Sequence, residues 1–245
     1  MPWRRVGDGI TVHARIFYDS TLNTMEVFGK NKEVSQKPRT EDFKKFFKKV
    51  QDHFHDQFVM VNFQVERAEK NDALVVHSHF NDYIIAIETL HNVTKSEPMP
   101  PKNDVVTYLF TKGPLYEGRW QSDLPGGELD YEATFDTFCS ERSSAAVVKY
   151  ISMSSYDYTV AATAWILGLK KYKKFTYKDF VHMKSTFSDD AKSLKGMFYI
   201  STTNKHLTCA DTYDHFSEGT TTFDELSNVL LPASIVKNQI FLVHN

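Results

Sequence analysis

The chain of 245 residues lacks several features that identify common protein classes. It has only two cysteines, Cys139 and Cys209, and they lie in no Cys/His spacing typical of zinc. No stretch approaches 18 apolar residues, which excludes a membrane-spanning helix. The formal charge of −2 gives no overall attraction to nucleic acid or to an anionic membrane. We therefore predict a soluble protein with no metal site of this kind, whose cysteines are reduced thiols.

Common enzyme signatures are also missing from the sequence. There is no glycine-rich phosphate loop, no Gly-x-Ser-x-Gly elbow and no His-Glu motif of zinc proteases. The first nine residues show no apolar run after Arg4 and Arg5, so no secretory signal is predicted. These observations favour an intracellular protein, cytoplasmic or nuclear, and predict no cofactor. Whether the protein is an enzyme stays uncertain, with the balance against it.

A suspected internal repeat is the most informative feature that is present. Short matches occur in the same order along both halves of the chain, and coincidence is the alternative explanation. The offset falls from 138 (residues 18 and 156) to 135 (residues 102 and 237). The matched pairs include Tyr18-Asp19 with Tyr156-Asp157, Asp42-Phe43 with Asp179-Phe180, His79-Phe80 with His215-Phe216, and Lys102-Asn103 with Lys237-Asn238.

The repeat predicts two units, at 1–111 and 128–245, joined by a linker rich in Gly and Pro at 112–127. In the first unit, Phe43, Phe46, Phe47 and Val50 share one face of a helix that begins near Thr40. Residues 10–18 predict a strand or a short helix. Strands are predicted at 59–65, 74–80, 83–93 and 105–110, mainly antiparallel because the first connections are short.

The second unit is predicted to repeat this order. A helix at about 128–139 precedes it, and Phe180, Met183 and Phe187 mark a helix that matches the first. Strands are predicted at 197–202, 207–216, 220–231 and 235–243. Residues 222–225 could instead open a helix, because they fit a capping box.

This order of a short strand ending in glycine, an aromatic-anchored helix and four strands resembles the nuclear transport factor 2-like (SnoaL-like) superfamily. The resemblance covers about residues 20–110 and 150–245, and it rests on the spacing of Gly29 to Phe43 and of Gly168 to Phe180. It implies an α+β fold of two cone-like units, each with a helix packed on a curved, mainly antiparallel sheet. It also implies either an acid–base enzyme or a catalytically silent module that binds partner proteins.

Three sets of polar residues are candidates for function. A pocket in the second unit would be lined by Tyr158, His206, Thr208, Asp211 and Tyr213. A metal or proton-transfer site could use His77 and His79, which lie on one face of a predicted strand. A nucleic-acid surface could use the lysines of two matching segments, Lys44, Lys45, Lys48, Lys49, Lys171, Lys173 and Lys174.

Each candidate also has a simpler interpretation. A repeated histidine is more often structural, and lysines opposite a Phe stripe are typical of any solvated amphipathic helix. The Tyr18-Asp19 and Tyr156-Asp157 pairs could be acid–phenol sites, but an Asx turn is the simpler explanation.

We therefore predict a non-catalytic protein-interaction or scaffold module. It would be a monomeric chain whose two units pack as an intramolecular pseudo-dimer. The alternatives are a ligand-binding protein or acid–base enzyme that uses the second unit, and an RNA-associated module.

Overall fold

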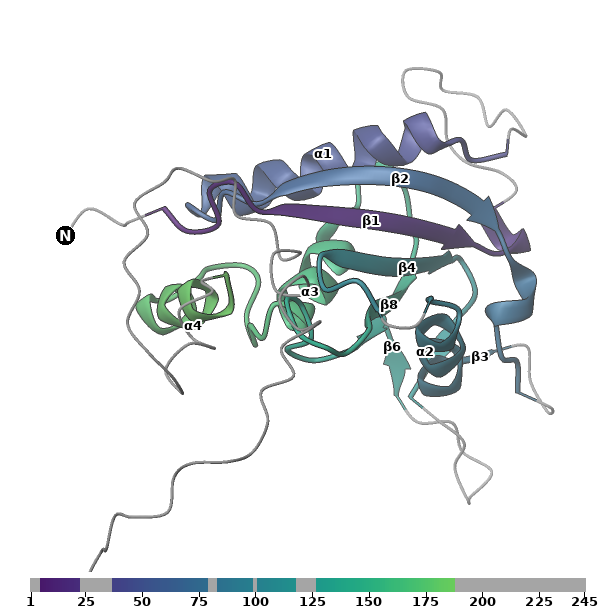
Figure 1. Cartoon of the computed structure of the whole chain (residues 1–245). Coiled ribbons are helices and arrows are strands. Elements are labelled where there is room, and N and C mark those ends of the chain that lie inside the picture. Colours follow the sequence, from purple (N-terminus) through teal and green to yellow (C-terminus); the bar gives the residue numbers. More distant parts are fainter. Residues whose placement is uncertain (1–4, 23–36, 79–82, 99–100, 118–126, 188–245) are drawn as a thin grey trace, which may run out of the picture. The chain divides into compact units, whose positions relative to one another are not determined.

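A computed structural model describes residues 5–22, 37–78, 83–98, 101–117 and 127–187 (Figure 1). All of them belong to one unit of the chain, Met1–Thr212. The strands predicted between residues 197 and 243 lie outside the described residues. No helix in the described ranges is long and apolar enough to cross a membrane.

A five-stranded sheet forms the centre of this unit, in the order β2-β1-β4-β8-β7. The first four of these strands are parallel to their neighbours, and β7 runs antiparallel to β8. Every residue of β4 is buried, which is typical of a parallel strand covered on both faces. The strands are β1 (Thr11–Tyr18), β2 (Asn62–Lys70), β4 (Val105–Thr111), β7 (Tyr131–Ala133) and β8 (Ser144–Lys149).

One face of the sheet packs on α1 (Thr40–Asp56), α3 (Asp157–Ile166) and α4 (Tyr177–Phe187). The predicted stripe of α1, from Phe43 to Val50, is fully buried. On α4, Met183 and Phe187 are buried and Phe180 is partly buried, so both helix predictions are confirmed. Between this face and α3, the hydroxyl groups of Tyr108 and Thr163 lie 2.8 Å apart, and Thr163 donates to the Thr159 carbonyl.

The other face packs on α2 (Ala86–Lys95) and on a small sheet of β3 (Ile84–Ile85), β5 (Leu115–Tyr116) and β6 (Glu128–Leu129). Ala86, Leu90 and Val93 fall at i, i+4 and i+7 of α2 and are buried against this face. Two short 3₁₀ helices, η1 (Ser20–Leu22) and η2 (Asp72–Leu74), follow β1 and β2.

Several predictions about local structure are wrong. Residues 83–93 form β3 and α2 rather than one strand, because the buried apolar residues follow a helical spacing from Ala86 onward. The helix predicted at 128–139 is replaced by β6, β7 and a loop. Of the strand predicted at 74–80, the described part contains the end of η2 and a bridge at His77. The main sheet is largely parallel, not antiparallel.

The main sheet contains strands from both sides of the predicted linker. β4 precedes residues 112–127 and β8 follows them, yet the two strands pair directly. Within the described residues, strands from both predicted units therefore share one sheet, instead of forming two sheets packed as a pseudo-dimer. The protein is α+β with mixed sheets, and the repeated cone-like units are not seen in the part of the chain described.

Candidate functional site

Strand β7 forms one edge of the main sheet and pairs only with β8 in the described residues. The Thr134 amide donates to the Ala145 carbonyl at 3.0 Å, and the Lys149 amide donates to the Asp130 carbonyl at 2.9 Å. Bonded pairs alternate along an antiparallel ladder. The backbone N–H and C=O groups of Tyr131 and Ala133 therefore point away from β8, toward the edge.

The two outward-pointing residues differ in accessibility. Ala133 is only 6% exposed, whereas Tyr131 is half-buried. Both α2 and α3 contact β7, so the helices flank the strand on its two faces. Tyr131 is the more accessible point at which another chain could pair with this edge.

A cavity of about 620 Å³ lies between α2 and the end of β7. This volume is in the range of ligand-binding clefts. Ile87 of α2 is 50% exposed although its side chain is apolar. The cavity is lined by Val76, Ile87, Glu88, Leu90, His91, Asn92, Thr94 and Thr134.

An aromatic pair follows β7 directly. The rings of Phe135 and Trp165 have centroids 4.6 Å apart, and Phe135 is 38% exposed. An apolar cavity and an exposed aromatic ring thus lie at the same end of one edge strand. Exposed apolar groups grouped in this way are typical of surfaces that bind other molecules.

The loop after β7 is held by a polar pair. His182 Nε2 lies 3.0 Å from Asp136 Oδ1, and Asp136 has a positive φ of 54°. Gly168, at φ 78°, supports the pair because a Cβ there would lie 2.2 Å from the His182 ring nitrogen. The Arg142 guanidinium donates to the Asp136 carbonyl at 2.7 Å. These contacts connect the loop with the end of α3 and with α4.

Electrostatics along β7 are set by burial. Burial raises the pKa of the Glu132 carboxyl, and the nearby Glu117 charge adds to this effect. At the start of the strand, a hydrogen bond with Asp130 raises the pKa of the Tyr158 phenol. Tyr158 belongs to the predicted pocket, but His206, Thr208, Asp211 and Tyr213 lie outside the described residues.

The histidine and acid–phenol candidates show no catalytic arrangement in the described residues. His77 is exposed and forms a bridge with Ile84, while His79 is not described. No group of three or more His, Cys, Asp or Glu that could hold a metal occurs in the described ranges. Asp19 accepts a hydrogen bond from the Thr21 amide at 3.0 Å, so the Asx-turn interpretation is confirmed for Asp19, whereas Asp157 is the first residue of α3.

The predicted lysine surface divides into two kinds of residue. On α1, Lys44 pairs with Glu41 and Lys48 with Asp52, each at 2.8 Å, and Lys49 donates to the Met153 carbonyl. Lys45 is exposed on the same helix. The second segment, with Lys171, Lys173 and Lys174, is exposed between α3 and α4.

Cys139 corrects the prediction of reduced thiols, because it takes part in a disulfide. It follows the loop that carries Asp136, and its backbone amide donates to the Asn103 carbonyl at 2.9 Å. Like Asp136, it has a positive φ, of 56°.

The edge strand was missed in the sequence because residues 128–139 were assigned to a helix. Tyr131 and Ala133 alternate with Glu132 after Gly126-Gly127, which is typical of a short strand after a turn. Three residues are too few for this alternation to outweigh a helix prediction.

Comparison with known proteins does not identify a family. No protein-family model matches the chain, and no curated protein matches it. A solved structure, metalloproteinase-II from Bacteroides fragilis, is similar to this chain. The match covers 76% of this chain and 55% of the metalloproteinase, so this chain spans about half of the length of that protein. The sequence identity is 12% and the TM-score is 0.42, values too low to support an argument about fold or function.

Proposed function

We propose that this protein is a non-catalytic interaction module that binds an extended segment of a partner protein along β7. The observation that supports this proposal is the edge position of β7 beside an apolar cavity. An unpaired strand edge offers backbone hydrogen bonds to a second chain. A neighbouring cavity can then select a side chain of that chain.

The partner segment would be extended and would carry an apolar side chain. Its backbone would pair with the outward groups of β7, most accessibly those of Tyr131. Its apolar side chain would enter the cavity beside Ile87 and Leu90, while a second would contact Phe135. Such a complex gains affinity from the backbone and specificity from the cavity.

The compartment is part of this proposal. The prediction of an intracellular protein rested on two observations, the absence of a secretory signal and the expectation of reduced cysteines, and the Cys139 disulfide contradicts the second of them. Disulfides persist in oxidising compartments and are rare in the cytosol. We therefore infer that the module works in an oxidising environment.

A peptide library displayed on phage tests the proposal with the full-length chain as bait. Peptides selected by the parent protein should be extended and apolar, and Ile87→Asp should weaken their binding about tenfold or more. Val181→Asp is the matched control, because Val181 is also an apolar helix residue and is 51% exposed on α4. Equal loss in both variants, or selected peptides that bind Ile87→Asp as well as the parent, would contradict the proposal.

A further inference from the structure

The segment that connects α3 with α4 concentrates positive charge. Four of its five residues from 170 to 174 are lysines, and all four are exposed. None of these four ammonium groups forms an ion pair with a carboxylate in the described residues, in contrast with Lys44 and Lys48 of α1. Like charges so close in sequence repel one another, so this arrangement favours binding of an anion. The four residues are Lys170, Lys171, Lys173 and Lys174.

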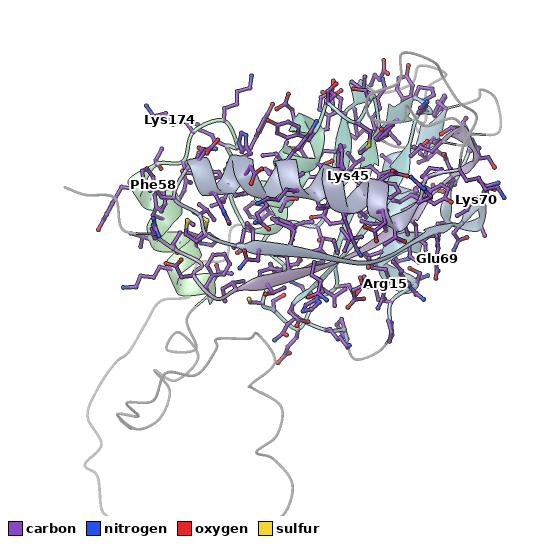
Figure 2. The ribbon with its side chains drawn as sticks, turned by 90° about the horizontal axis from the view of Figure 1, so that it is seen from above. Arg15, Lys45, Phe58, Glu69, Lys70 and Lys174 are labelled. Carbon is purple, nitrogen blue, oxygen red and sulfur yellow. The ribbon has the colours of Figure 1, made fainter. Side chains whose placement is uncertain are left out.

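This basic segment is anchored to α1. The Gln57 side chain donates to the Tyr172 carbonyl and accepts from the Phe175 amide, both at 3.0 Å. The Phe175 ring stacks on Phe54 with centroids 5.8 Å apart. Figure 2 shows Lys174 near the C-terminal end of α1, at the end marked by Phe58. The lysines are therefore presented from a backbone that is fixed at two points.

Aromatic side chains surround a hollow in the same segment. The hollow has a volume of about 660 Å³ and is lined by residues 170–177. Tyr177 is 71% exposed, and the Lys173 ammonium lies 5.9 Å from the centroid of the Tyr172 ring. The nearest acidic residue in the sequence, Asp179, accepts two hydrogen bonds from Thr176. Cationic groups thus alternate with aromatic surface that can pack against a ring.

We propose that this basic segment binds a sulfated polysaccharide. Its sulfate groups would pair with the lysine ammonium groups, and the C–H face of a sugar ring would pack on Tyr172 and Tyr177. Many weak charge contacts to a polyanion add up, because binding releases the counterions condensed on it. A surface rich in lysine with aromatic residues also suits nucleic acid. The Cys139 disulfide favours the polysaccharide, since it indicates an oxidising compartment.

The experiment uses the full-length chain and surface-immobilised heparin as the probe. Lys171→Ala, Lys173→Ala and Lys174→Ala are combined in one variant. The control combines Lys44→Ala, Lys45→Ala and Lys48→Ala, which removes the same charge from α1. We expect the first variant to lose at least about tenfold in affinity, with a shallower dependence on salt, and the control to change by less than about threefold.

Three outcomes would overturn the proposal. The parent could fail to bind heparin at 0.15 M salt, which is about physiological ionic strength. The control could lose as much affinity as the test variant, which would indicate a general charge effect. Desulfated heparin could bind as tightly as heparin, or single-stranded RNA that carries the same number of negative charges could do so. Either result would remove the preference for sulfate. Matching circular dichroism melts of both variants confirm that folding is intact.

Discussion

The two edges of the main sheet are protected in different ways. β2 is nine residues long, and its exposed residues are mostly charged. Its pairing with β1 skips Glu66, which forms a bulge whose carboxylate lies 3.5 Å from His13 Nδ1 and 4.0 Å from Arg15 Nη2. Charges and a bulge are known devices that prevent an edge strand from pairing with other chains.

β7 has no bulge and carries little charge. It contains three residues, its only charged side chain is Glu132, and its register with β8 is regular. The comparison teaches that a short antiparallel strand at the end of a parallel sheet can leave an edge open without exposing a long template for aggregation. We therefore expect substitutions near the two edges to have different consequences.

The largest expected effect concerns the core below β2. Phe47 is buried and contacts Phe63 of β2, with ring centroids 5.8 Å apart. Phe47→Ala should lower the free energy of unfolding by about 3–5 kcal/mol because it leaves a cavity. Urea denaturation measures this loss. Phe58→Ala is the control, since Phe58 is 45% exposed. Similar midpoints for both variants would show that α1 does not support the β2 edge.

A smaller effect is expected beside the β7 edge. Gly168→Ala would force a Cβ against the Asp136–His182 pair and place alanine at a positive φ. The expected cost is about 1–3 kcal/mol. Gly127→Ala is the control, because no atom lies within 4 Å of a Cβ at that position. A thermal melt in which both variants match the parent would contradict the close contact described.

The pH dependence of Glu132 gives a still smaller effect on the same edge. Its pKa is raised in the folded protein, so folding favours the protonated carboxyl. The stabilisation is fully present below the unfolded pKa and is lost as pH rises through the folded pKa. Glu132→Gln should therefore stabilise the protein at pH 7, by less than about 1 kcal/mol because the side chain is partly solvated. Denaturation at pH 7 and at pH 3.5, where the difference between the two proteins should shrink, measures this effect. A gain that is the same at both pH values would be inconsistent with it.

The smallest effect on stability is expected at the exposed edge of β2. Arg67→Val combined with Glu69→Val should change the free energy of unfolding by less than about 0.5 kcal/mol. The same change should promote self-association, because it removes charges that protect this edge. Light scattering at increasing protein concentration checks this. A variant that stays as monodisperse as the parent would show that the bulge at Glu66 is sufficient protection.

The helices with strong periodicity could be predicted from sequence, and the pairing of strands could not. Phe43 to Val50 identified α1 because one face carries the apolar residues and the other carries lysines. The uninterrupted apolar run of β4 is compatible with a parallel strand, but a run alone does not name its neighbours. Ile84 and Ile85 looked like part of a longer strand, because the helical spacing begins only at Ala86.

The suspected repeat is explained in part by capping. Asp42 accepts a hydrogen bond from the Arg39 amide, and Asp179 accepts one from the Thr176 amide. The matched Asp-Phe pairs thus open two helices in the same way. In contrast, Tyr18-Asp19 ends a strand while Tyr156-Asp157 begins α3. A shared way of opening a helix can therefore account for one matched pair without a duplication, while the matches beyond residue 187 lie outside the described residues.

The buried contact between Tyr108 and Thr163 has a consequence for the direction of hydrogen bonding. The Thr163 hydroxyl has one proton and donates it to the Thr159 carbonyl, so the Tyr108 phenol must donate to Thr163. Tyr108→Phe would remove the donor to Thr163 and leave only a lone pair of the Thr163 hydroxyl oxygen without a partner. Thr163→Val would strand a buried O–H with no acceptor, which is the more costly defect. The two hydrogen bonds therefore run in one direction, from Tyr108 to Thr163 to the Thr159 carbonyl. Equal melting temperatures for the two variants would contradict this direction of donation.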